Sequence, residues 1–122
     1  MENPMLDKIP AERCGKRLAK LSKGLAHPIR VKIIRLLADK PADSRCVCGD
    51  IVDALPLAQS TVSQHLKVLR ETGWIKGEID GPYVCYCIVE GILEYYLTLM
   101  EHCLLSNTKM HKIEDQAGQI EP

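Results

Sequence analysis

Apolar residues recur at helical spacing in the first third of the chain. Over residues 11–25, three leucines share one side of a predicted amphipathic helix: Leu18, Leu21 and Leu25. A second helix is predicted to begin at Pro28, because the N–H that proline lacks would have no helical partner in the first turn. Its apolar stripe consists of Ile29, Ile33, Leu36 and Leu37.

A turn-prone segment, Pro-Ala-Asp-Ser at positions 41–44, interrupts this pattern. Asp43 or Ser44 could cap a short third helix, since their side chains can accept hydrogen bonds from unpaired N–H groups at a helix start. The apolar residues of that helix are Ile51, Val52 and Leu55. A turn around Pro56 then leads into a fourth helix.

The fourth helix begins near Gln59 and ends at Gly73. Val62, Leu66 and Leu69 recur at helical spacing and should point inward. Gly73 is expected to end the helix, because glycine readily adopts the left-handed conformation of a C-terminal cap.

Beyond this helix the period changes from helical to alternating. Residues 74–79 and 83–88 predict two strands, and Asp80-Gly81-Pro82 predicts the turn of a β-hairpin between them. A last helix is expected over about residues 91–105, with Ile92, Tyr95, Leu99 and His102 or Cys103 along one side.

This order of elements predicts a mostly α fold with a two-stranded β wing, a winged helix-turn-helix. The domain is expected to span residues 11–106 and to provide both DNA binding and dimerisation. Residues 1–10 are interpreted as a flexible N-terminal segment and residues 107–122 as a polar tail. In such a fold the fourth helix enters the major groove and the hairpin reaches an adjacent groove or the backbone.

The outer side of the fourth helix carries side chains that suit DNA. Short hydroxyl and amide groups can contact base edges, and Lys or Arg can hold phosphates. His65 could contact a phosphate or pack between helices. The candidate DNA-binding residues are Gln59, Ser60, Thr61, Ser63, Gln64, His65, Lys67 and Arg70.

Composition limits the class of protein. The 122 residues are 46% hydrophobic and 26% charged, which is ordinary for one globular domain. No apolar run approaches the roughly 20 residues that span a bilayer, and the N-terminus lacks the apolar core of a secretory signal. We therefore expect a cytoplasmic protein with no membrane partner.

Charge is unevenly distributed although the net charge is zero. Nine basic and three acidic residues precede residue 36, whereas six acidic residues and two lysines follow residue 89. The folded chain could show a basic face to DNA, or the basic residues could simply form a solvated helix surface.

The chain resembles the ArsR/SmtB family of arsenic- and metal-responsive repressors. Residues 27–37 are similar to the second helix of that family, residues 60–73 to its recognition helix and residues 81–88 to its wing. The resemblance covers about residues 13–105 and implies a homodimer built largely from the first and last helices. Ala58 stands where the family often has a serine cap.

The pair Cys46-Val-Cys48 resembles the Cys-Val-Cys-Asp element with which family members bind arsenite, antimonite or soft divalent metals. Soft thiolates select soft ions. Because residues two apart on a helix point about 200° away from each other, both sulfurs can reach one ion only if the helix start is distorted. Ion binding would then reshape the element before the recognition helix. Alternatively, both cysteines are small buried hydrophobes.

A third thiolate would complete trigonal coordination, but Ile51 occupies the family position for it. Cys14 is the first candidate for that ligand, since the resemblance implies that the N-terminal helix of the other subunit can supply a thiolate; the alternative is that Cys14 is a half-buried structural cysteine. Cys85 and Cys87 lie two apart on a strand, so their sulfurs share a face and could hold a soft ion or form a strained disulfide. Cys103 is assigned to the core or the dimer interface.

A second family site, for zinc, is poorly matched. His111 and Glu114 resemble half of it, but His102 lies nine residues before His111 and Met100 replaces the expected acid. These histidines are interpreted as solvated or structural.

The sequence thus favours a dimeric repressor that binds double-stranded operator DNA and releases it when arsenite, As(III), or another soft metal ion binds. No organic cofactor is expected. The alternatives are a thiol redox or reactive-sulfur sensor and a Cd-, Pb- or Zn-responsive repressor. An enzyme is disfavoured, because the sequence contains no nucleophile–base–orienter set and no glycine-rich phosphate loop. A winged helix that binds protein is disfavoured by the polar outer side of the fourth helix.

Overall fold

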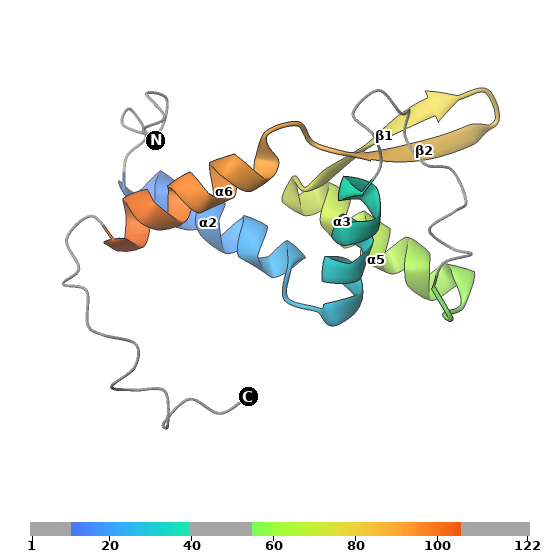
Figure 1. Ribbon diagram of the computed structural model, residues 1–122, viewed down its shortest axis with the longest axis horizontal. Coiled ribbons are helices and arrows are strands. Elements are labelled where there is room, and N and C mark those ends of the chain that lie inside the picture. The colour runs from blue at the N-terminus through green and yellow to red at the C-terminus, as the bar shows by residue number, and fades with distance from the viewer. Residues whose placement is uncertain (1–10, 40–54, 106–122) are drawn as a thin grey trace.

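A computed structural model describes residues 11–39 and 55–105 (Figure 1). Its elements follow the order α2, α3, α5, β1, β2, α6 and a π-helical turn, η1. Most of the expected third helix, its capping residues Asp43 and Ser44, and both terminal segments lie outside the described residues. Leu55, the last apolar residue predicted for that helix, is described and is buried in the core. The bounds are α2 Ala11–Gly24, α3 Pro28–Ala38, α5 Gln59–Thr72, β1 Ile75–Asp80, β2 Tyr83–Ile88, α6 Ile92–Met100 and η1 Glu101–Leu105.

Local sequence accounts for the start of α3. Pro28 occupies the first turn, and the His27 side chain caps the helix by accepting a hydrogen bond at Nδ1 from the Ile29 N–H at 3.1 Å. The sequence predicted Pro28 at this position but did not identify His27 as the cap. The predicted stripe is confirmed, because Ile33 and Leu37 are buried and its other members pack against the core.

Helix α5 begins and ends where the sequence predicted. Ala58 is extended and makes no side-chain capping bond, so the missing serine does not prevent the helix from starting at Gln59. Gly73 has φ 95° and ψ 8°, the left-handed conformation expected of it. Its N–H donates to the Arg70 carbonyl, and the Trp74 N–H donates to that of Leu69, the two bonds of a Schellman motif.

Strands β1 and β2 form an antiparallel hairpin in which Ile75 pairs with Ile88. The turn consists of Gly81 and Pro82, and Gly81 has φ 62°, which glycine adopts without strain. The hairpin starts one residue later than predicted, because Trp74 belongs to the helix cap and not to the strand.

The sequence predicted one uniform helix at this end of the chain, but the structure has two helical forms in succession. Helix α6 ends at Met100, and a single π-helical turn, η1, continues it to Leu105. Ile92 and Leu99 are buried, and Tyr95 and Cys103 pack against the same core, so the predicted apolar side is confirmed.

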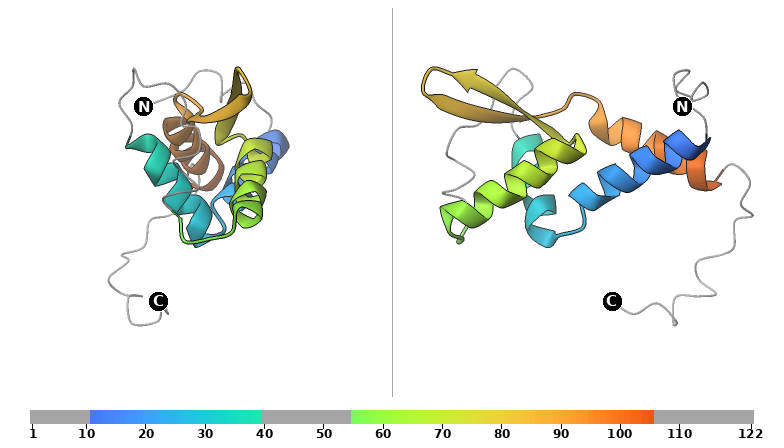
Figure 2. Two further views of the ribbon diagram at one scale, coloured as in Figure 1. Left: turned by 90° about the vertical axis from the view of Figure 1, so that its right-hand side faces the viewer. Right: turned by 180° about the vertical axis from the view of Figure 1, so that it is seen from behind.

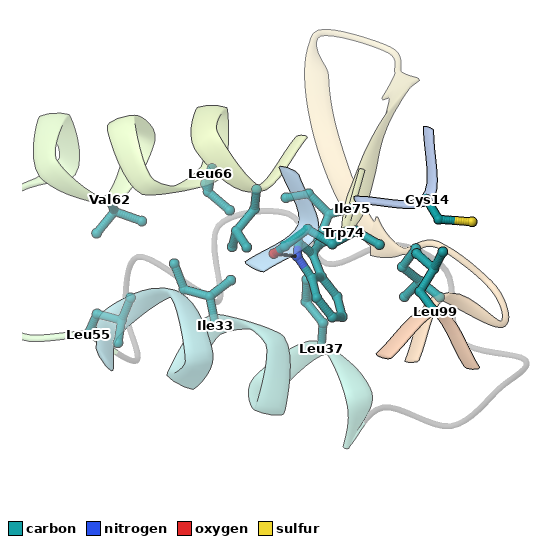
Figure 3. Packing of buried hydrophobic residues seen from close by; sticks show 12 residues of the cluster. Cys14, Ile33, Leu37, Leu55, Val62, Leu66, Trp74, Ile75 and Leu99 are labelled. Carbon is teal, nitrogen blue, oxygen red and sulfur yellow. Dashed lines mark hydrogen bonds between the residues drawn. The ribbon is translucent and has the colours of Figure 1, made fainter. Parts of the chain in front are cut away.

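The core joins all of these elements (Figure 3). Trp74 lies near its centre, is 1% exposed and donates its indole N–H to the Leu21 carbonyl at 2.7 Å. A Cβ added to Gly24 would overlap the Trp74 indole and the Thr72 hydroxyl. The end of α2 can therefore approach the end of α5 closely only because residue 24 is glycine.

The elements are distributed between two ends of the molecule. Helices α2 and α6 pack against each other at one end, and the hairpin extends away from them toward the other end (Figures 1 and 2). Helix α5 lies below the hairpin, with its first residues on the side of the hairpin tip. Among the residues that the structure describes, no helix combines the length and apolar content that a membrane span requires.

Candidate nucleic-acid interface and cysteine pair

Helix α5 separates its side chains into a buried and an exposed face. Val62, Leu66 and Leu69 are buried, as the sequence predicted. Seven of the eight candidate DNA-binding residues are exposed on the helix: Gln59, Ser60, Thr61, Ser63, Gln64, Lys67 and Arg70. The face is continuous from the first turn to the last, and no ion pair between described residues covers it.

The position of α5 suits insertion into a groove. Its N-terminal end and the tip of the β1–β2 hairpin both lie at the end of the molecule opposite α6 (Figure 1). A duplex that received the first turns of α5 would therefore be within reach of the wing, which is the docking geometry of a winged helix-turn-helix.

His65, the eighth candidate, is half-buried and lies between α5 and α3. Its ring centroid is 4.4 Å from that of His27, and its Nδ1 is 3.4 Å from Nη1 of Arg30. Burial lowers the pKa of His65, and the nearby His27 and Arg30 charges lower it further. These contacts favour the packing interpretation of His65 over a phosphate contact.

Arg30 is a structural link that the sequence did not reveal. Its Nε donates to the Gly24 carbonyl at 2.9 Å and its Nη2 to the Lys23 carbonyl at 3.0 Å, which satisfies acceptors at the C-terminal end of α2. The same guanidinium reaches His65 on α5. In the sequence, Arg30 was only one of the nine basic residues before residue 36. Local periodicity does not show that the Arg30 side chain turns back toward α2.

Cys14 and Cys103 form a pair. Cys14, on α2, is 1% exposed, and Cys103, on η1, is half-buried and packs against the same core. The two thiols are hydrogen-bonded; burial raises the pKa of Cys103, and the neighbouring Cys14 raises it further. The sequence assigned Cys103 to the core or the dimer interface and made Cys14 a candidate metal ligand or a half-buried structural cysteine, but it did not predict that the two thiols lie together.

The other cysteines divide into two groups. Cys46 and Cys48 lie outside the described residues. On β2, Cys85 is 4% exposed and Cys87 is half-buried, and both are disulfide-bonded in the structure. Tyr86 and Ile88 of the same strand pack against the core. Within residues 11–39 and 55–105, no three His, Cys, Asp or Glu side chains are grouped to hold a metal ion.

The fold, the exposed polar face of α5 and the adjacent wing define a winged helix-turn-helix DNA-binding protein. Comparison with known proteins narrows this class. The family described as bacterial regulatory protein, arsR family, matches residues 27–76. The chain belongs to this family and is a DNA-binding transcriptional regulator, not an enzyme.

Two relatives and one solved structure illustrate the similarity. An uncharacterized HTH-type transcriptional regulator, MJ1325 of Methanocaldococcus jannaschii, is 33% identical over 86 residues, which is 70% of this chain and 93% of the relative. The HTH-type transcriptional regulator CmtR of Mycobacterium bovis is 34% identical over 105 residues, 85% and 86% of the two chains. The homodimeric winged helix-turn-helix domain of Mb0332 from M. bovis has a TM-score of 0.57 at 24% identity, over 80% of this chain and 89% of that one.

Proposed function

We propose that this protein is a homodimeric repressor that occupies a palindromic operator and releases it when arsenite or antimonite binds cysteine thiolates. It would thereby control arsenic or metal resistance genes. The observation that carries the DNA-binding part is the exposed polar face of α5 beside the wing. The choice of inducer is inferred from Cys46-Val-Cys48, which precedes this helix in the chain.

The exposed residues of α5 have separate tasks in this proposal. Ser60, Thr61, Ser63 and Gln64 read or position bases, because hydroxyl and amide groups can both donate and accept at base edges. Lys67, and to a lesser extent Arg70, hold phosphates. His65 orients the helix through its contacts with α3.

An exposed apolar stripe supports the homodimer. Four residues of α6 and η1 follow helical spacing on the side away from the core, and they are between 36% and 57% exposed: Leu93, Leu97, Met100 and Leu104. Apolar groups gathered on one helix face are typical of a surface that a partner covers. In a homodimer, the same face of a second copy would cover this stripe.

The inducer acts through soft thiolate chemistry in this proposal. Cys46 and Cys48 supply two sulfurs, and Cys14 is the first candidate for a third, since Ile51 offers none. The ion needs to change operator affinity only by a coupling free energy of about 1–3 kcal/mol.

Two alternatives share the DNA-binding mechanism. In one, the ion is Cd, Pb or Zn. In the other, thiol oxidation or reactive sulfur is the signal; the disulfide-bonded state of Cys85 and Cys87 on the wing favours this second candidate.

A titration of operator binding separates these functions. Fluorescence anisotropy or gel shift with the operator region should be followed with arsenite, cadmium, zinc and a mild oxidant, for wild type and for Cys46→Ser, Cys48→Ser, Cys14→Ser and Cys85→Ser. We expect arsenite to release wild type but neither Cys46→Ser nor Cys48→Ser.

Normal release of both of these variants would contradict the arsenite site. Release by oxidant alone, lost in Cys85→Ser, would establish the redox alternative. Release by cadmium or zinc and not by arsenite would show that the inducer is one of these metals. The mechanism of ion-induced release from the operator would be unchanged.

A further inference from the structure

Two helices that are far apart in sequence bring a pair of thiols together inside one protomer. Helix α2 packs against both α6 and η1. Cys14 is the buried cysteine of α2, and Cys103 follows Leu99 by four residues, so it lies on the core side of the helix in either α or π geometry. Figure 3 shows Cys14 at the same end of the core as Leu99.

The surroundings of the pair determine what it can bind. Cys14 is 1% exposed within an apolar cluster, and Cys103 is the accessible member of the pair. Burying two thiolates beside each other among apolar groups is costly unless their charge is neutralised. A ligand that leaves the complex uncharged therefore suits this pair better than one that requires free thiolates.

We propose that Cys14 and Cys103 of one protomer together bind trivalent arsenic and thereby fasten α2 to η1. The inference deepens the proposed function, on which it rests, by giving Cys14 a sulfur partner within its own chain. Arsenous acid enters at the accessible Cys103 and is then captured by Cys14.

The chemistry is a condensation without electron transfer. As(OH)₃ and two thiols give (RS)₂AsOH and two molecules of water. Two As–O bonds break, two As–S bonds form, and each thiol proton leaves with a hydroxide as water. Arsenic stays trivalent, and the product is neutral, as the apolar surroundings require.

The bridge would act on the elements that connect the two ends of the molecule. Tyr95 and Tyr96 of α6 already bind α2, through Arg17 Nη1 at 2.8 Å and through Ser22 Oγ at 2.8 Å. Trp74, next to the end of α5, contacts Tyr96 with ring centroids 5.1 Å apart. A change in how α2 and η1 pack would therefore reach the cap of the DNA-binding helix through residues in direct contact.

The test uses the full-length, fully reduced Cys46→Ser/Cys48→Ser variant, in which the proposed inducer site is removed. The probe is phenylarsine oxide, which bridges two thiols with the loss of one water. After capture, the protein is unfolded, free thiols are alkylated and the protected cysteines are identified by mass spectrometry. We expect Cys14 and Cys103 to be protected. The bridge should also raise the unfolding midpoint, on the order of 10 °C, because it closes a long loop.

Adding Cys103→Ser to this background should leave Cys14 alkylated and abolish the rise in midpoint. Adding Cys87→Ser, a half-buried cysteine of the wing, is the matched control and should leave Cys14 and Cys103 protected. Protection of Cys14 that persists in Cys103→Ser, or its absence in the starting variant, would overturn the inference. Circular dichroism verifies that each variant is folded before the probe is added.

The result is independent of operator release. If the pair stays unreactive while arsenite still releases wild type through Cys46 and Cys48, the inference fails and the proposed function stands. If the pair binds the arsenical but arsenite never releases wild type from the operator, the inference stands and the proposed function fails.

Discussion

Trp74 joins three parts of the molecule through one side chain. Its indole N–H donates to the Leu21 carbonyl of α2, its ring makes a T-shaped contact with Tyr96 on α6, and its backbone N–H completes the cap of α5. The sequence placed Trp74 at the start of a strand, because alternation begins there. Its actual role depends on α2 and α6, which are distant in the chain and invisible to a local pattern.

At Gly24 this packing leaves no room for a side chain. We predict that Gly24→Ala destabilises the protein by about 1–3 kcal/mol, because the added methyl group overlaps the Trp74 indole and the Thr72 hydroxyl. Urea unfolding followed by the fluorescence of Trp74, the single tryptophan, measures the change.

Gly15→Ala is the matched control on the same helix. A Cβ at Gly15 would have nothing within 4 Å. Alanine should therefore stabilise α2 by about 0.5–1 kcal/mol through its higher helix propensity. Equal effects of the two substitutions would show that helix propensity, not contact with Trp74, governs residue 24.

At the scale of elements, α5 was predictable because its determinants are local. The spacing of Val62, Leu66 and Leu69 sets the buried face, and Gly73 sets the end. The exposed candidates follow from the same periodicity. The role of His65 could not be predicted in this way, because its partners lie elsewhere in the chain: His27 is the N-cap residue of α3, and Arg30 is in α3.

Lys67 tests the DNA-binding face of α5. We predict that Lys67→Ala weakens binding to operator and to unrelated DNA alike, and lowers the slope of log affinity against log salt by about 1, as expected for one lost phosphate contact. Binding isotherms at several salt concentrations measure the slope.

Lys16→Ala is the control for a change in overall charge. Lys16 is exposed on α2. Helix α2 packs against α6, and α6 lies at the end of the molecule opposite the start of α5 (Figure 1). Its removal should leave the slope unchanged. A slope that falls equally in both variants would indicate that net charge, not the α5 face, controls binding.

The last helix shows the limit of periodicity at this scale. One uninterrupted helix was predicted, whereas α6 gives way to the π-helical turn η1 after Met100. The apolar side was still predicted correctly, because a residue four positions on stays near the same side in both kinds of helix. The change of hydrogen bonding itself has no recognisable sequence pattern here.

At the scale of the whole molecule, the two ends have different surfaces. One end presents the polar face of α5 and the wing, and the other presents the apolar stripe of α6 and η1 (Figure 1). This separation suits a proposed dimer whose halves meet at the stripe and present two recognition helices to a palindromic operator.

Leu97→Glu tests this arrangement. Leu97 is 50% exposed in the centre of the stripe. Placing a carboxylate there should raise the dimer dissociation constant at least about tenfold, or about 1.4 kcal/mol, because the charge would lose its water in the interface. Sedimentation equilibrium measures the constant, and operator affinity should fall with it.

Ile79→Glu, at an 85% exposed residue of the wing, introduces the same charge away from the stripe and should leave the dissociation constant unchanged. A Leu97→Glu protein with the association state of wild type would exclude the stripe as the dimer interface.

The sequence by itself determined the class of fold, the buried and exposed faces of α5 and the turn of the wing. These features depend on spacing within one element and on the conformational preference of single residues such as Gly73 and Gly81. It also placed the candidate thiols along the chain. It could not pair Cys14 with Cys103, turn Arg30 toward α2 or seat Trp74 between helices, because each contact joins elements that are distant in sequence. Only tertiary packing decides which of those side chains meet.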